Sequence, residues 1–203
     1  MKFSSDGTLL IGKNMVVADL HLGILGFPDF SLLDRLIEVY AKSRASRLII
    51  NGDVKHMLGK AELSSAERFI HHLREHVSEL IIVKGNHDGY LNQIAEVHNT
   101  FRDGKTVFAH GHRKFSNAME GKRIVLAHSH PAVFIPDRVG GVKERAWLYG
   151  RAEGKECIVM PAFNEYCSST AVNLEKPAGF IFKYMKEFEA FTLDGFYFGK
   201  VKV

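Results

Sequence analysis

Six short runs of apolar and β-branched residues constrain the fold of this chain more than any other feature of its sequence. Each run is three or four residues long, which suits a buried strand and is too short for a typical helix. They lie at residues 9–11, 15–18, 48–50, 80–83, 106–109 and 124–127. The sequence therefore predicts a protein built around buried β-strands.

Two stretches between these runs have the spacing of an amphipathic helix. Ser31 can cap the first helix, whose apolar face carries Leu32, Leu33, Leu36, Ile37 and Tyr40. Ser64 or Ser65 can start the second helix, whose inward residues are Phe69, Ile70 and Leu73. Alternating strands and helices predict a sheet with helices on its faces.

The pattern changes from about Glu156 onward. Four short segments there are rich in aromatic or β-branched residues and predict strands at 158–160, 179–184, 187–191 and 196–198. Asp194-Gly195 predicts a turn between the last two. We expect a second, more antiparallel sheet that packs on the first, and 203 residues fit one domain spanning residues 1–203.

Composition excludes several classes of protein. Hydrophobic residues at 46% and charged residues at 25% are ordinary for a globular chain and argue against disorder. No apolar stretch approaches the ~18 residues of a membrane span, and the first residues lack the apolar segment of a signal peptide. Two cysteines, Cys157 and Cys167, are too few for a disulfide framework. We expect reduced thiols in a cytoplasmic protein, with no membrane partner.

Five polar motifs follow the apolar runs in a fixed order. They are Asp19-Leu20-His21, Gly52-Asp53, Gly85-Asn86-His87-Asp88, His110-Gly111-His112 and His128-Ser129-His130. Ligands of open α/β folds bind beyond the carboxyl ends of strands, so these side chains are expected to gather at one edge. A single histidine such as His98 is better explained as a surface residue, but five such motifs indicate a metal site.

The donor types agree with this interpretation. In a strand-like segment residues i and i+2 point to the same side, so Asp19 and His21 can aim at one ion. His128 and His130 can do the same at a neighbouring pair, while the carboxylate of Asp53 can bridge two cations. Mixed Asp, Asn and His donors suit manganese, iron, zinc or similar ions. Gly52, Gly85 and Gly111 allow tight turns and close backbone approach.

Together these motifs resemble the signature of the calcineurin-like metallophosphoesterase superfamily, and the resemblance covers most of the chain. It implies a two-sheet αββα sandwich. Three further segments, Asn51–Gly59, His130-Pro131 and Met160–Asn164, are similar to the DNA ligase-associated and the archaeal SbcD-related phosphoesterases.

The resemblance also implies a role for each motif residue. Asp19, His21 and His130 would hold a first divalent ion, and Asn86, His110 and His128 a second, with Asp53 bridging both. Manganese is expected, with iron, nickel, cobalt or zinc as alternatives. A hydroxide or water between the ions would attack phosphorus in line. His87 would protonate the leaving oxygen or stabilise its charge, and Asp88 would orient His87 or its loop.

One residue departs from the family pattern. Ala127 precedes His128 where the family usually has glycine. The added Cβ leaves the liganding atoms unchanged, so metal binding is still expected.

Substrate choice depends on the residues after Asp53. Protein phosphatases of the superfamily carry an arginine there, whereas this chain has Val54-Lys55-His56. Without that bidentate clamp for a dianionic monoester, a phosphodiester in DNA, RNA or a nucleotide becomes the expected substrate. Lys55 and His56 either touch the substrate phosphate or serve as a solvated lysine and a structural histidine. The length favours a compact diesterase over a repair nuclease with DNA-capping regions.

Two alternatives remain open: a phosphomonoesterase, and a non-catalytic scaffold that binds protein partners on the same fold. His87, present with the full ligand set, favours catalysis. Elsewhere, Trp147 is expected in a core or subunit contact rather than stacked on a base. The Phe27–Phe30 segment is either a rim of the substrate cleft or a lead-in to the first helix.

Overall fold

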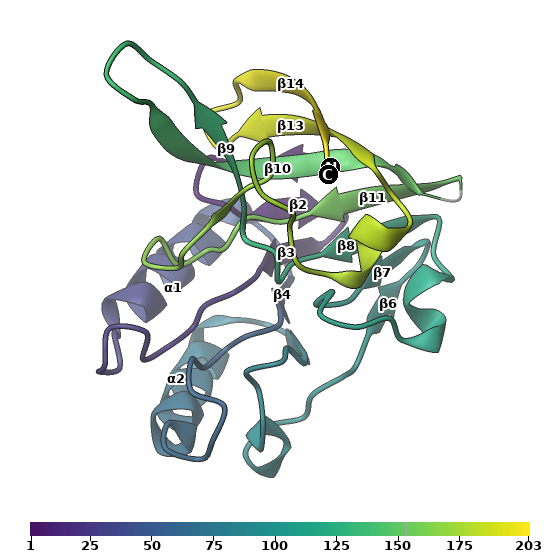
Figure 1. The fold of residues 1–203 in the computed structure, drawn as a ribbon. Helices are drawn as coiled ribbons and strands as arrows, with labels where there is room; N and C mark the ends of the chain where they lie inside the picture. Colours follow the sequence, from purple (N-terminus) through teal and green to yellow (C-terminus); the bar gives the residue numbers. More distant parts are fainter. Residues whose placement is uncertain (153) are drawn as a thin grey trace.

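Two β-sheets packed face to face form the framework of the protein (Figure 1). The structure is a computed structural model that describes residues 1–152 and 154–203. Figure 1 shows two α-helices on the outer side of the smaller sheet and the larger sheet on its other side. The mixed α/β fold with two sheets predicted from the sequence is thus confirmed.

The smaller sheet has five strands in the order β1-β2-β3-β4-β5. Their bounds are Lys2–Phe3, Leu9–Ile11, Asn14–Val17, Arg47–Asn51 and Leu80–Val83. β3, β4 and β5 run parallel, and β1 and β2 are antiparallel additions at one side. Because parallel strands end at the same edge, the residues after β3, β4 and β5 come close together in space.

Helices α1 (Ser31–Ser43) and α2 (Leu63–His76) cover the outer face of this sheet. Leu36 of α1 and Phe69 of α2 are fully buried in a cluster that includes Met15 and Val17 of β3. The expected apolar faces are confirmed, but the expected helix starts are wrong. Phe30 is the N-cap of α1, and Glu62 that of α2.

The reason for the different start of α1 lies in Asp29. Its Oδ1 accepts hydrogen bonds from the backbone N–H of Ser31 at 3.0 Å and from the Ser31 hydroxyl at 2.6 Å. An aspartate two residues upstream thus satisfies an amide at the helix start, and Ser31 becomes the first helical residue.

The larger sheet follows the order β12-β9-β10-β11-β8-β7-β6, and β10 also pairs with β13, which pairs with β14. The bounds of β6 to β10 are Phe101–Asp103, Thr106–Phe108, Arg123–Leu126, Pro131–Ile135 and Val142–Ala152. Those of β11 to β14 are Lys155–Val159, Thr170–Ala171, Glu187–Thr192 and Tyr197–Lys202. β7, β8 and β11 are parallel neighbours, and most other pairs are antiparallel.

The β9–β10 hairpin was not predicted, and its loop projects from the body of the protein in Figure 1. The long strand β10 pairs first with β9 and then, through Ala146 to Tyr149, with β13. Charged residues interrupt its apolar pattern, so the sequence around Lys143, Glu144 and Arg145 does not have the appearance of a buried strand.

Side chains alternate across the sheets and fill the space between them. Val16 of β3 and Ile49 of β4 face Phe108, Val125 and Ile158 of the larger sheet. Trp147 is 1% exposed within this cluster, and its ring centroid lies 4.9 Å from that of Phe3. The expected core position of Trp147 is therefore confirmed.

The outer face of the larger sheet is covered by short 3-10 helices. These are η2 (Ser116–Met119) and η3 (Phe180–Lys183), while η1 (Leu91–Gln93) follows β5. The strand expected at 179–184 is thus wrong. Phe180, Ile181 and Phe182 are all buried, which alternation in a half-buried strand does not allow. Within the described residues, no helix is both long and apolar enough to span a membrane.

Candidate metal centre

The five polar motifs meet where the parallel strands of both sheets end. Asp19 and His21 follow β3, Asp53 follows β4, and Asn86 follows β5. From the larger sheet, His110 follows β7, and His128 and His130 follow β8. Carboxylate or imidazole atoms of Asp19, His21 and Asp53 lie within 4.8 Å of one another, as do those of Asp53, His110 and His128. The gathering expected from the sequence is present.

A left-handed backbone directs most of these side chains. Seven non-glycine residues in the described part of the chain have a positive φ, and five of them are expected metal ligands. Their φ values lie between 41° and 72°, at Asp19, His21, Asp53, His128 and His130. Such backbone costs about 1–3 kcal/mol per residue and is typical of functional sites. We expected a strand-like i, i+2 geometry for Asp19 with His21 and for His128 with His130. The backbone instead makes sharp turns at these residues, and the turns bring the two side chains of each pair to the centre.

Two glycines allow the motifs to approach each other. A Cβ on Gly52 would lie 2.1 Å from Nδ1 of His110, and a Cβ on Gly85 would lie 2.0 Å from Oδ1 of Asp53. Both distances are far inside van der Waals contact, so any larger residue would push a donor out of place. The expected role of these glycines in close approach is confirmed.

Asp19, His21 and His130 form one side of the centre. Nε2 of His130 lies 3.3 Å from Oδ1 of Asp19, and Nδ1 of His130 donates to the Ser168 carbonyl at 2.9 Å. That hydrogen bond fixes the ring and leaves Nε2 free to bind an ion, as partners of metal-bound histidines commonly do. The Oδ2 atom of Asp19 accepts from the backbone N–H of His128 at 3.2 Å.

Asn86, His110 and His128 form the other side. Nδ1 of His110 lies 2.9 Å from the Asn51 carbonyl, and Nε2 lies 3.2 Å from Oδ1 of Asn86. His128 faces this pair, with its ring centroid 5.2 Å from that of His110.

Asp53 lies between the two sides. Its Oδ2 is 3.2 Å from Nε2 of His110 and 3.5 Å from Nε2 of His21. Its Oδ1 accepts from the backbone N–H of His87 at 2.8 Å. One carboxylate thus reaches donors of both groups, which is the arrangement required of a bridging ligand.

Electrostatics favour the metal-binding protonation state at Asp19, His21 and His128 but not at His110 and His130. Burial raises the pKa of Asp19, but His130 and His110 outweigh burial and hold it below its usual value. Burial lowers the pKa of His21 and of His128 to about 4. His110 and His130 behave differently. Burial lowers the pKa of each, but Asp53 outweighs burial at His110 and raises its pKa to about 9, and Asp19 does the same in direction at His130. A cation bound by these two imidazoles would take the place of a proton. Ionised carboxylates and neutral imidazoles are the forms that bind metal ions.

Unsatisfied polar atoms test whether these residues fit a pair of divalent ions. Within residues 1–152 and 154–203, Asp19 Oδ1 and His21 Nε2 are buried without a hydrogen-bond partner. Burying such atoms is costly unless something binds them. Oxygen and nitrogen donors grouped around them are the ligands that divalent transition metals prefer. The residues of the first side therefore fit a divalent ion, and those of the second side offer the same kinds of donor.

His87 and His56 lie at the rim of this centre. Both are half-buried, and their rings stack with centroids 5.7 Å apart and planes at 17°. Nδ1 of His87 is hydrogen-bonded to the His56 carbonyl, and Nδ1 of His56 lies 3.4 Å from Nδ1 of His21. Both histidines therefore lie where the sequence placed them, next to the expected ligands.

Asp88 is fully buried beneath the centre. Its carboxylate accepts backbone N–H groups from Asp53 at 2.9 Å, Val54 at 2.8 Å and Gly85 at 2.8 Å, with Lys55 at 3.4 Å. From the sequence, we expected Asp88 to orient either the His87 ring or its loop. These hydrogen bonds agree with the second role, because they hold the loops after β4 and β5.

Lys55 departs from the sequence expectation. It is fully buried, and its ammonium group donates to the Met57 carbonyl and, at 3.0 Å, to the Gly59 carbonyl. Its burial contradicts the solvated lysine of the sequence expectation. The side chain turns back into its own loop, where these two carbonyls accept hydrogen bonds from its ammonium group.

Two residues near the centre were missed by sequence reasoning. His112 has its ring centroid 5.5 Å from that of His110, and Cys167 has Sγ within 4.8 Å of nitrogen atoms of His21 and His130. His112 belongs to a recognised motif and could have been proposed. Cys167 has no such signal, because its loop reaches the centre only through folding.

The fold of the chain is shared with a solved structure. The structure is similar to that of the nuclease MPE from Pseudomonas putida, with a TM-score of 0.62 and 18% identity over 83% of each chain, which shows a shared fold. Vps29 from Entamoeba histolytica is more distant, with a TM-score of 0.44 and 15% identity over 88% of this chain and 89% of that one. No curated protein sequence matches the chain.

A family model described as calcineurin-like phosphoesterase matches residues 13–154, which is more than half of the sequence. The chain therefore belongs to the calcineurin-like phosphoesterase family and is a hydrolase that acts on phosphoester bonds.

Proposed function

We propose that the protein is a dinuclear metal-dependent phosphodiesterase that acts on a nucleic acid or a nucleotide diester. The observation that carries this proposal is the convergence of oxygen and nitrogen donors on both sides of Asp53, with buried unsatisfied atoms on Asp19 and His21. Asp19, His21 and His130 would hold the first ion, and Asn86, His110 and His128 the second, with Asp53 shared.

Two divalent ions bound there would lower the pKa of water and neutralise charge on the phosphoryl oxygens. The protein supplies their spacing and orientation. His110 and His130 each use Nδ1 for a backbone carbonyl, so each presents Nε2 to the centre.

His87 is the proposed proton donor to the leaving oxygen. Its backbone N–H is fixed by Asp53, and its Nδ1 is engaged with the His56 carbonyl. With Nδ1–H directed at that carbonyl, a proton to be transferred resides on Nε2. The half-buried ring can then deliver it to a substrate oxygen at the rim.

The rim supports a diester rather than a monoester substrate. A monoester carries up to two negative charges and benefits from a fixed cation beside the metal centre. Lys55 is withdrawn into its own loop, which leaves His56 as the rim residue from this segment. A singly charged diester places a smaller demand on the rim, and the proposal gives His56 the contact with a non-bridging oxygen or the leaving group.

The test compares bis-p-nitrophenyl phosphate with p-nitrophenyl phosphate as substrates of metal-stripped protein resupplied with Mn, Fe, Ni, Co or Zn. We expect metal-dependent turnover that favours the diester. Preference for the monoester would replace the proposal with a phosphomonoesterase. Two bound ions without turnover of any substrate would favour a protein-binding scaffold.

A further inference from the structure

Cys167 lies beside the first metal position, on the loop between β11 and β12. The residue is 8% exposed, and its thiol donates to the Asp19 carbonyl at 3.7 Å. Its Sγ, with one nitrogen each from His21 and His130, forms a group whose atoms all lie within 4.8 Å of one another. That spacing is compatible with three ligands of a single ion.

Hydrogen bonds on both sides of Cys167 connect its loop to the motifs that contain His21 and His130. Asn164 donates from Nδ2 to the Leu20 carbonyl at 2.7 Å and accepts the Cys167 N–H at 3.2 Å. The Ser168 carbonyl accepts from His130 at 2.9 Å. These hydrogen bonds position the thiol relative to Asp19, His21 and His130 rather than leave it on a free loop.

An independent observation points to a ligand at this place. Asp19 Oδ1 and His21 Nε2 are buried and lack hydrogen-bond partners among the described residues. Asp19 is 0% and His21 4% exposed, so water does not readily satisfy them. Cys167 thus borders buried donor atoms that a bound cation would satisfy.

We propose that Cys167 is a further ligand of the first metal ion and makes that position selective for thiophilic ions such as Zn²⁺ over Mn²⁺. This inference rests on the proposed metal centre. On binding, the S–H proton leaves to solvent and the sulfur lone pair forms the bond to the ion. Thiolates favour zinc over manganese, whereas carboxylate and imidazole donors accept both. The second position, built from oxygen and nitrogen donors, keeps the broader choice.

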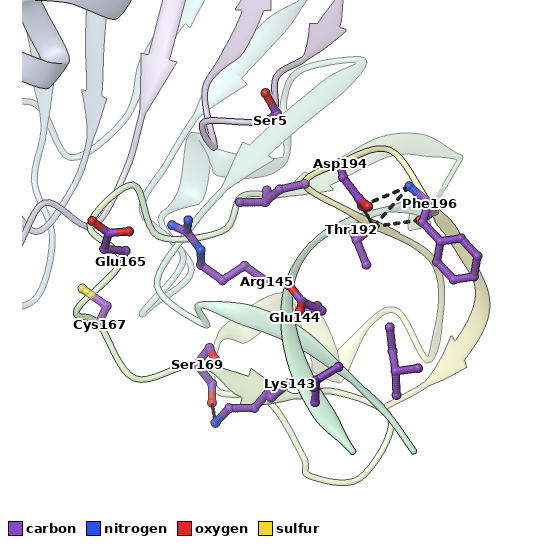
Figure 2. Close-up of a pocket in the computed structure, with 13 residues that line it drawn as sticks. Ser5, Lys143, Glu144, Arg145, Glu165, Cys167, Ser169, Thr192, Asp194 and Phe196 are labelled. Carbon is purple, nitrogen blue, oxygen red and sulfur yellow. Dashed lines mark hydrogen bonds between the residues drawn. The ribbon is translucent and has the colours of Figure 1, made fainter. Parts of the chain in front are cut away.

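A neighbouring cavity gives the thiol a route for proton release. Figure 2 shows Cys167 on the wall of this cavity, close to Glu165 and the Arg145 side chain. The cavity has a volume of about 680 Å³. Arg145 is held there by the Ala162 carbonyl at 3.0 Å, so the wall next to Cys167 is polar and structurally defined.

The test is the absorption spectrum of the full-length protein after its metals are replaced with Co²⁺. We expect a thiolate-to-cobalt charge-transfer band in the near ultraviolet, together with the visible bands of bound cobalt. Cys167→Ser should lose the charge-transfer band and keep visible bands, while Cys157→Ala, a change within β11, should keep both. Cobalt bound at the exposed His72, Glu75 and His76 of α2 gives no thiolate band and cannot mimic the result.

A competition between Zn²⁺ and Mn²⁺ provides the second readout. Cys167→Ser should weaken Zn²⁺ at one of the two positions by at least about tenfold, since loss of even an outer partner of a metal ligand costs 10–100-fold. Mn²⁺ binding should change little. If the serine variant fails to fold, alkylation of Cys167 in the wild-type protein replaces it, with Zn²⁺ expected to slow the reaction at least about tenfold.

The outcomes separate this inference from the proposed function. Visible cobalt bands without a charge-transfer band, or a band that survives Cys167→Ser, overturn the role of Cys167 and leave the metal centre standing. Equal alkylation of Cys167 with and without Zn²⁺ also overturns it. Failure of the protein to bind cobalt at all, with no diester turnover, overturns both proposals.

Discussion

The two halves of the metal centre are built in different ways. The second position draws Asn86, His110 and His128 from the ends of β5, β7 and β8, and its imidazole and amide groups already contact one another. The proposed first position draws Asp19 and His21 from the end of β3 and His130 from the end of β8, and the loop that carries Cys167 borders it. Strand ends thus supply the donors of both positions, and the proposed first position also adjoins a loop that is distant in the sequence.

This difference suggests that the two positions differ in how readily they tolerate change. The second is held by a backbone carbonyl of a buried strand, Asn51, through His110. The first has unsatisfied atoms on Asp19 and His21, and its outer wall is a loop fastened by hydrogen bonds. We expect the first to be the more selective of the two for its ion and the more sensitive to its surroundings.

The strongest test removes what both positions share. Asp53→Ala should lose both ions and reduce turnover by about 10⁴-fold or more, since each ion contributes several kcal/mol to the transition state. Metal content per chain and diester hydrolysis measure this. Asp137→Ala, an exposed change in the β9–β10 loop, is the control. Retention of both ions by the Asp53 variant would contradict the bridging role.

His130→Ala and His128→Ala separate the positions. Each should remove one ion and lower turnover by about 10³-fold, because the remaining ion alone supplies less charge stabilisation. In cobalt-loaded protein, His130→Ala should also abolish the thiolate band, whereas His128→Ala should leave it. Identical spectra for the two variants would contradict the proposed difference between the two metal positions.

His87→Ala leaves both positions intact and removes the proposed proton donor. We expect normal metal content and a fall in kcat of about 10²-fold, the lower range for loss of a general acid. A leaving group that needs no protonation, such as p-nitrophenolate, should show a smaller loss than an alkyl leaving group. His98→Ala serves as the matched histidine control, and full activity of the His87 variant would refute the assignment.

Asp88→Ala tests the support beneath the centre. Removing the carboxylate leaves amides of Asp53, Val54 and Gly85 without their acceptor, which should cost more than about 3 kcal/mol in the free energy of unfolding. Metal affinity should fall about 10–100-fold as the loops shift. Denaturant unfolding and metal titration measure both, and Asp88→Asn, which keeps one acceptor oxygen, should lose less.

The smallest expected effects compare two neighbours in the chain. His56→Ala should raise KM for the diester by up to about tenfold, the value of one hydrogen bond. Lys55→Met should leave KM unchanged and instead lower thermal stability, because it removes the ammonium group that holds Met57 and Gly59. A raised KM in the Lys55 variant would instead indicate that Lys55 contacts the substrate.

The sequence alone was enough to locate the candidate centre. Short apolar runs predicted the strands, and polar motifs directly after them predicted donors at one edge, because parallel strands end together. The glycines at 52 and 85 were also predictable, since only glycine permits such close approach of chain segments. These features depend on local patterns that a linear sequence records.

Tertiary structure decided what local patterns do not record. The Gly179–Tyr184 segment forms a 3-10 helix because it covers the larger sheet with three consecutive buried side chains. Lys55 is buried against the Met57 and Gly59 carbonyls, and Asp88, from the segment after β5, accepts its backbone N–H. Cys167 lies near His21, which is more than a hundred residues earlier in the chain, and near His130, which is nearly forty residues earlier. Such contacts depend on how distant segments pack, so only the folded protein determines them.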